Sequence, residues 1–356
     1  HATTVVLDVF WDNKGTISPE KFRSFNNEVV ILMRSLNRTH YAGEKLRVTI
    51  DVSNFSTDSF QQSELTWELS ANQKTLQSGA IPVTEIIPGN VTSLCVIEVE
   101  TPANQSQSLR LTVKLAGADR IIENEWEFWT YKRPILHKDA SRIWTDVSKL
   151  GISLYGAKYT GKIGFEGFSY KEEKDIDLAI SDHLSTELLQ FLLDGGKAWI
   201  MAEEGNQFDE VITRFLPIFW NYIWFPAQIG TTMGMIIHDH PSLESFPHDG
   251  RSNWNWFHLV DRAIALNLET VPQVKPIVEV IDNHNRGKHL AYSFETKVGE
   301  GKLYVSTFNI LKNLKRPEVE SLLHENIHYL MSDQFNPTAN LTVGELLGLF
   351  KLKGNW

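Results

Sequence analysis

The chain has 356 residues, of which 42% are hydrophobic and 22% are charged, and its formal net charge is −10. A globular chain of this length normally folds around two hydrophobic cores rather than one. The acidic balance, with no basic stripe, argues against nucleic-acid binding, and no stretch approaches the roughly 20 consecutive apolar residues of a membrane span.

The first 27 residues predict one strand followed by one helix. Residues 3–10 are a compact run of apolar and β-branched side chains, which is typical of a buried strand. Ser18 and Pro19 then predict a helix start, as N-cap and first helical residue. One strand and one helix cannot bury a core alone. This segment therefore either packs on the domains C-terminal to it or is the last β/α unit of a barrel.

Residues 28–133 alternate apolar and polar side chains with a period of two. The alternation is clearest over residues 46–52, 65–69 and 109–115, and polar turns such as residues 72–74 separate such runs. Short alternating strands joined by polar turns are typical of an antiparallel sandwich. We therefore predict an immunoglobulin-like β-sandwich in this region.

Residues 134–335 show a different pattern, in which strands and helices alternate. A short apolar strand at residues 177–180 precedes a run with helical spacing at 184–193, and a second buried strand lies at 198–201. This order predicts a parallel pair of strands connected by a helix, and hence an α/β domain.

The rest of the chain predicts a hairpin, a helix and a tail. Residues 289–294 and 302–307 are two strands across a glycine-containing turn. A helix should run from Pro317 to about residue 332, and the tail over residues 336–356 contains a short amphipathic segment at 342–350.

Eight short segments occur in an order and spacing found in a known enzyme family. They are Phe10–Gly15, Ile17–Arg23, His240–Leu243, Phe246–Pro247, Trp254–Trp256, Pro276–Asp282, Gly299–Leu303 and Phe335–Pro337. Together they resemble the C-terminal region of bacterial family 2 glycoside hydrolases of the β-galactosidase-like kind. The resemblance covers nearly the whole chain, but none of its pieces is a sharp catalytic motif.

The resemblance implies a parent enzyme whose barrel carries two catalytic glutamates, with accessory domains after the barrel. Retaining hydrolysis needs two carboxyl groups roughly 5–5.5 Å apart, and in this family both lie upstream of the last barrel strand. We therefore expect residues 1–27 to be the terminal β/α unit of that barrel and the chain itself to be non-catalytic. The dipeptides Asn27-Glu28 and Asn124-Glu125 mimic the family's acid/base pair only by coincidence.

The same resemblance implies the setting of the protein. The parent would act on plant or host glycans as a secreted, periplasmic or cell-surface bacterial enzyme. The chain would pack on the missing N-terminal barrel, shape its entrance or support a homo-oligomer. No cofactor is expected.

The predicted α/β domain resembles the flavodoxin-like fold of class I glutamine amidotransferases. An active member needs a nucleophilic cysteine and a histidine base. The only cysteine, Cys95, lies in the predicted sandwich, and Asp182-His183 comes after the first α/β strand. Amidotransferase chemistry is therefore excluded by residue type, and this fold is expected to serve as a scaffold.

Aromatic side chains provide candidate sugar contacts. Trp220 and Trp224 lie in an aromatic run, and Trp254 and Trp256 form a second pair. Exposed aromatic rings can stack on carbohydrate, whereas buried ones pack the core. A second hypothesis is therefore a pair of carbohydrate-binding modules. Trp11 comes directly after the predicted barrel strand and would line the substrate pocket of the parent enzyme.

A third hypothesis is a zinc-dependent hydrolase. Residues 324–328 read His-Glu-x-x-His, in which His324 and His328 would hold the metal and Glu325 would activate water. The alternative is a packing helix, since downstream only Asp333 and Glu345 could serve as a third ligand.

A second histidine-rich segment lies between residues 238 and 249. His238, Asp239, His240 and His248 could bind a transition metal. The alternative, which we favour, is a loop whose histidines hydrogen-bond backbone carbonyl groups and whose course is set by Pro241 and Pro247.

Overall fold

The computed structural model describes residues 6–117, 120–134, 143–153, 176–202, 208–216 and 232–351. The chain divides into two compact units, His1–Arg133 and Pro134–Trp356. Strands outnumber helices in both, so the protein is a multidomain, β-rich fold. No helix among the described residues is long and apolar enough to cross a membrane.

The first described residues differ from the strand predicted there. Over residues 6–10 the structure has no strand, and Leu7 makes only an isolated bridge to Asn13. Phe10 is 78% exposed, so the prediction of a buried strand is wrong for this part of the segment. The predicted helix start is confirmed, because helix α1 (Pro19–Arg23) begins after Ser18, whose side chain accepts a hydrogen bond from the Lys21 amide.

The first unit contains two sheets. The smaller consists, in spatial order, of β1 (Val29–Arg34), β3 (Lys45–Asn54) and β6 (Asn90–Glu100). The larger consists of β2 (Thr39–Tyr41), β8 (Ile121–Tyr131), β7 (Gln107–Ala116), β4 (Phe60–Ala71) and β5 (Lys74–Ile86). Every pair is antiparallel except β2 with β8.

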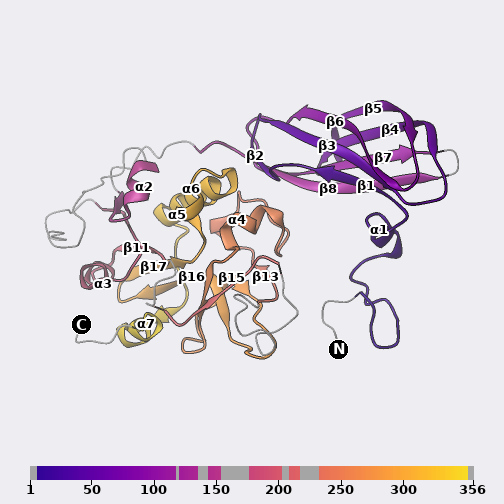
Figure 1. The fold of residues 1–356 in the computed structure, drawn as a ribbon. Helices are drawn as coiled ribbons and strands as arrows, with labels where there is room; N and C mark the ends of the chain where they lie inside the picture. Colours follow the sequence, from indigo (N-terminus) through magenta and orange to yellow (C-terminus); the bar gives the residue numbers. More distant parts are fainter. Residues whose placement is uncertain are drawn as a thin grey trace. The chain divides into compact units, whose positions relative to one another are not determined.

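The two sheets share one hydrophobic core and so form a β-sandwich (Figure 1). Val48 and Ile50 from β3 belong to the same buried cluster as Leu65 from β4 and Leu111 from β7. Each fully buried side chain of this size contributes about 1.5–3 kcal/mol to folding. Alternating side chains along these strands therefore provide the core, as the period of two predicted.

The second unit is built around one large mixed sheet. Its main path runs β12 (Glu210–Ile212), β14 (Ile264–Asn267), β16 (Leu290–Val298), β17 (Gly301–Ser306), β11 (Lys197–Met201), β10 (Leu178–Ser181) and β9 (Ile143–Thr145). Three further strands join it: β13 (Met235–Ile237), β15 (Pro276–Val280) and β18 (Asn340–Leu341). Its helices are α2 (Ser148–Ser153), α3 (Thr186–Leu193), η2 (Pro241–Leu243), η3 (Trp254–Trp256), α4 (Phe257–Val260), α5 (Ile310–Asn313), α6 (Pro317–Met331) and α7 (Val343–Leu349).

Several predicted elements of this unit are confirmed. Strand β10 precedes α3 in the sequence and β11 follows it, and the two strands pair in parallel. Strands β16 and β17 form the antiparallel hairpin, and α6 spans the predicted C-terminal helix. Along its main path the sheet is thus parallel from β9 to β17 and antiparallel from β17 to β12, whereas the additional strand β18 pairs with β16 in parallel.

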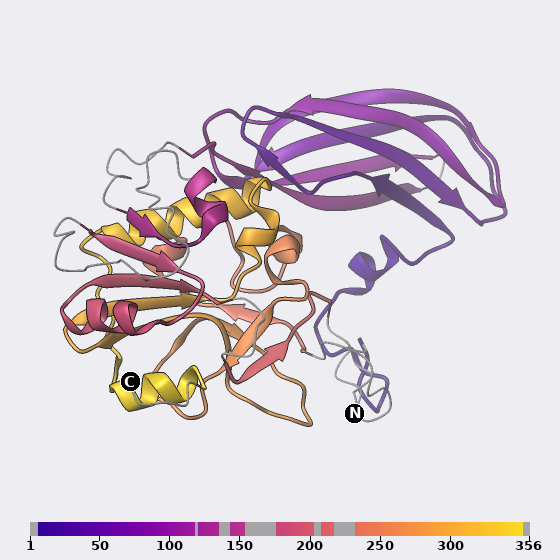
Figure 2. The ribbon, with the colours of Figure 1, turned by 60° about the vertical axis from the view of Figure 1, so that its left-hand side comes forward.

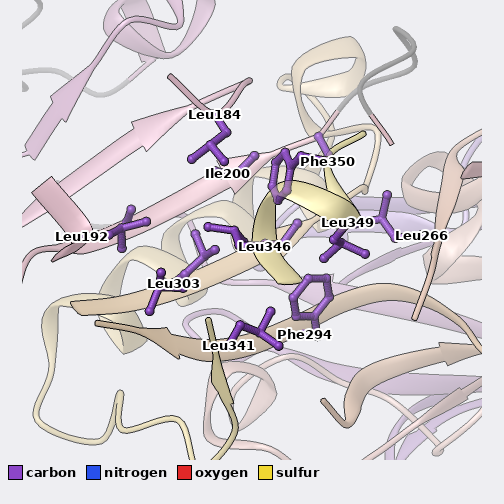
Figure 3. Close-up of a cluster of buried hydrophobic side chains, with 14 of the residues drawn as sticks. Leu184, Leu192, Ile200, Leu266, Phe294, Leu303, Leu341, Leu346, Leu349 and Phe350 are labelled. Atoms are coloured by element: carbon purple, nitrogen blue, oxygen red, sulfur yellow. The ribbon is translucent and has the colours of Figure 1, made fainter. Parts of the chain in front are cut away.

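Opposite faces of this sheet carry different helices. Leu346, Leu349 and Phe350 of the α7 segment pack with Phe294 of β16 and Leu303 of β17 in one buried cluster (Figure 3). The strands run between α7 on one side and α6 on the other (Figure 2). The amphipathic tail is therefore an integral part of the second core.

Gly301, at the start of β17, permits a close approach to α3. A Cβ atom at this position would overlap the Leu192 carbonyl of α3 and the Gly196 carbonyl. Only glycine lets the hairpin and the end of α3 pack this closely.

Candidate functional site

A polar cluster lies where two parallel strands of the second unit end. Asp146 comes directly after β9, and Ser181 is the last residue of β10, with Thr145 and Ile180 paired in register. In open α/β sheets, ligands bind beyond the carboxyl ends of the strands. This edge of the sheet is therefore the place where a site is expected.

The side chains of the cluster are joined by short polar contacts. The Ser181 hydroxyl lies 3.0 Å from Asp146 Oδ2 and 2.9 Å from the His183 carbonyl oxygen, so its single hydrogen is shared between two acceptors. His183 Nδ1 lies 2.7 Å from Asp182 Oδ1 and 3.8 Å from Asp146 Oδ2. Two carboxylates thus hold one side of the imidazole ring.

The two ends of the cluster differ in exposure. The Asp146 side chain is only 8% exposed, whereas the His183 side chain is 38% exposed. Ser181 is buried. A hydroxyl that is buried and bonded to a carboxylate orients that carboxylate, and it is poorly placed to act as a nucleophile.

Burial controls the charge of the cluster. Burial, with a smaller contribution from Asp182, raises the pKa of the Asp146 carboxyl to about 6 against the opposing effects of His183 and of the Ser181 hydrogen bond. The pKa of His183 is also raised, chiefly by its hydrogen bond to Asp182. A buried carboxyl group whose pKa lies near 6 can exchange a proton with a ligand near neutral pH.

One oxygen of the cluster lacks a partner within the described part of the chain. Asp146 Oδ1 is buried and accepts no hydrogen bond from any described residue. A buried carboxylate oxygen without a donor is costly. The arrangement can therefore accept a hydrogen bond from a bound molecule.

A second feature is an aromatic cluster around Trp254, which is 45% exposed. Its ring lies 5.1 Å from that of Phe215 and 6.0 Å from that of Phe257, which are themselves 5.4 Å apart. Rings at these distances support one another in tilted or edge-on packing. Trp254 is therefore partly exposed to solvent, while the rings of Phe215 and Phe257 pack against it and hold it in place.

The other tryptophans predicted to contact sugar are Trp256, Trp220 and Trp224. Trp256 is completely buried between Phe246 and Phe308, so it offers no surface to a sugar, and the prediction of a Trp254–Trp256 surface is wrong. Trp220 and Trp224 lie outside the described residues.

Trp11 lies on the surface of the first unit. Its side chain is 82% exposed, and its backbone has a positive φ of 69°. Its predicted role in a substrate pocket of the parent enzyme stays a prediction.

The His-Glu-x-x-His segment forms part of α6. Glu325 Oε1 accepts a hydrogen bond of 2.9 Å from the Ser245 amide and thereby ties α6 to a loop. Nowhere in the described ranges do three histidine, cysteine, aspartate or glutamate side chains come together as metal ligands. The geometry therefore gives the zinc hypothesis no support.

The histidines between residues 238 and 248 make local contacts. His240 and His248 each accept a hydrogen bond at Nδ1 from the backbone amide two residues further on, at 3.2 and 3.3 Å. His238 Nε2 lies 3.3 Å from Glu279 Oε2. The predicted bonds to backbone carbonyl groups are therefore wrong for His240 and His248, which accept from backbone amides instead.

Sequence reasoning missed Asp146 as a site residue. It placed Asp182 and His183 after a strand but gave them no role. The useful signal was their position, since both come after an apolar run at the end of a parallel strand. Strand β9 has only three residues, which is too short to be recognised from the sequence. The position of Asp146 at the end of this strand, beside the end of β10, could therefore not be predicted.

Comparison with protein families yields two matches. Residues 179–351 match the family described as Domain of unknown function (DUF8487), and residues 44–132 match Domain of unknown function (DUF8488). No curated protein matches the chain.

Solved structures include several distant neighbours. The β-glucuronidase of Parabacteroides merdae is 12% identical with a TM-score of 0.22, covering 49% of this chain and 24% of its own. A family 123 glycoside hydrolase from Clostridium perfringens is 10% identical with a TM-score of 0.24, covering 43% and 38%. E. coli alpha-2-macroglobulin is 15% identical with a TM-score of 0.22, covering 30% and 7%.

This chain therefore spans well under two thirds of each of these proteins. The neighbours include glycoside hydrolases, but likenesses with such low TM-scores carry no argument about function.

Proposed function

We propose that this chain is a non-catalytic, carbohydrate-binding accessory part of a β-galactosidase-like glycoside hydrolase. The ordered segments that resemble the C-terminal region of family 2 enzymes support the enzyme class. The structural observation that carries the binding function is the half-exposed indole of Trp254 on its aromatic base.

An exposed, supported indole suits a sugar ring. One face of many pyranoses presents C–H groups, which pack against a flat aromatic surface, while the hydroxyl groups at the edge remain in water. Phe215 and Phe257 hold Trp254 in place, so little side-chain entropy is lost when a ligand binds.

The remaining parts of the proposal concern architecture and setting. The sandwich would be immunoglobulin-like, and the α/β unit would use the amidotransferase-like fold only as a scaffold. Cys95 lies in β6 of the sandwich, and burial raises the pKa of its thiol, which makes it a poor nucleophile. Residues 1–27 would belong to an upstream catalytic barrel, and the parent enzyme would be secreted, periplasmic or on the cell surface of a bacterium.

Binding of the purified chain to a panel of plant and animal oligosaccharides tests the proposal. We expect the best ligand of the panel to lose at least tenfold in affinity with Trp254→Ala in isothermal titration. Phe55→Ala is the matched control, because it removes an exposed aromatic side chain of the first unit to which no sugar contact is assigned. Equal affinities for the wild type and Trp254→Ala, or no binding to any member of the panel, would refute the binding function.

A further inference from the structure

We propose that Asp146, Ser181 and His183 form a second binding site, which takes a ligand carrying a protonated amine. The proposal is independent of carbohydrate binding at Trp254, since it rests on other residues at the carboxyl ends of β9 and β10.

The first argument is the unmet hydrogen-bonding capacity of Asp146. Its side chain is more than nine-tenths buried, Oδ2 lies 3.0 Å from the Ser181 hydroxyl, and Oδ1 has no donor among the described residues. A carboxylate has no hydrogen to donate. The missing partner must therefore be a hydrogen-bond donor.

The second argument is the sign of the surrounding charge. Among the described residues, His183 is the one positive group that acts on Asp146, while Asp182 adds a negative charge. The described groups that raise the pKa of His183 are Asp182, Asp146 and Glu187, all acidic. Three carboxylates around one imidazole favour a cationic donor over a neutral or anionic ligand.

The third argument is that folding does not require a charge at Asp146. An asparagine would keep an oxygen for the Ser181 hydroxyl and would avoid burying a carboxylate. Groups that are costly to bury and lie at the ligand-binding edge of a sheet are typical of functional sites. The carboxylate is thus better explained by a ligand than by stability.

Amine binding at this site should depend on pH. An ammonium group prefers ionised Asp146, and burial raises the pKa of this carboxyl to about 6. Its ionised fraction increases about tenfold between pH 5 and pH 7, and loss of the His183 proton acts in the same direction. The affinity for an amine should therefore rise about tenfold over this interval.

Ethanolamine and ethylene glycol are suitable probes, because they differ only by an amine in place of a hydroxyl. Each is titrated into the labelled protein at pH 5 and pH 7, and NMR shifts of the His183 ring report occupancy. We expect ethanolamine to bind at least tenfold more tightly than ethylene glycol at pH 7, and about tenfold more weakly at pH 5 than at pH 7.

Two variants locate the site. Asp146→Asn should abolish ethanolamine binding, whereas Asp194→Asn, at the exposed end of α3, should leave it unchanged. An unchanged amide spectrum and a thermal midpoint no lower than that of the wild type would show that Asp146→Asn is folded. Equal binding of the two probes, or ethanolamine binding by folded Asp146→Asn, would overturn the proposal.

Discussion

The hydroxyl of Tyr329 in α6 donates a hydrogen bond of 2.7 Å to Glu295 Oε2 in β16. Burial and the adjacent carboxylate raise the pKa of Tyr329, so the phenol stays protonated and remains a donor. His240 Nε2 lies 3.6 Å from the same oxygen. The hydrogen bond between Tyr329 and Glu295 fixes α6 to the face of the sheet opposite α7.

Tyr329→Phe should therefore destabilise the second unit. It removes a hydrogen bond to a mostly buried carboxylate, and hydrogen bonds to charged groups contribute about 1.5–3 kcal/mol. Because Glu295 is 15% exposed, water can replace part of the contact, and we expect a loss of about 1–2 kcal/mol in urea unfolding. A change below about 0.3 kcal/mol would show that the contact does not hold α6.

Asp146→Asn should stabilise the protein near neutral pH. Burial raises the pKa of Asp146 from 3.8 to about 6, so its contribution to stability is present below about pH 4 and is lost as the pH rises through about 6. A rise of this size corresponds to about 3 kcal/mol at most, and we expect about half, because the buried asparagine amide carries a desolvation cost of its own.

Unfolding by urea at pH 4 and pH 8 checks this prediction. The advantage of Asp146→Asn should be present at pH 8 and should vanish at pH 4. A variant that is less stable than the wild type at pH 8 would mean that the carboxylate is a structural element.

Gly301→Ala should be strongly destabilising, because its Cβ would overlap backbone carbonyl groups of Leu192 and Gly196. Overpacking of this kind costs about 1–3 kcal/mol. Gly344→Ala is the matched control, since Gly344 lies in α7 with open space around the added methyl group. There we expect a gain of about 0.5–1 kcal/mol. Similar effects at the two positions would contradict the close approach of the hairpin to α3.

The His-Glu-x-x-His segment should not bind zinc. Glu325 is engaged by the Ser245 amide, and a catalytic zinc site needs three protein ligands. Added zinc or a chelator should therefore leave the thermal midpoint unchanged, and His324→Ala should not alter the metal content of the purified protein. One equivalent of zinc that is lost in His324→Ala would contradict this prediction.

Local periodicity predicted the long strands of the sandwich core and the two longest helices, but not short elements such as β12, β13 and α5. Alternation along β3, β4 and β7 and the helical spacing in α3 and α6 depend on which side chains face a core, and that information lies within each segment. The apolar run at residues 6–10 failed as a strand, because a run alone does not specify a pairing partner.

The candidate site was harder to predict than the fold. Trp254 and Trp256 are two residues apart, yet one is half-exposed and the other is enclosed by Phe246 and Phe308, which come from elsewhere in the chain. Asp146 and Ser181 are 35 positions apart, and only the parallel pairing of β9 with β10 brings them together. Such long-range placement is set by topology rather than by local pattern.

Hydrolysis of p-nitrophenyl β-D-galactoside and related glycosides by the purified 356-residue chain tests the accessory role most directly. We predict no turnover above that of buffer, together with oligosaccharide binding that depends on Trp254. Turnover that disappears when one of the chain's own glutamates is changed to glutamine would contradict the account.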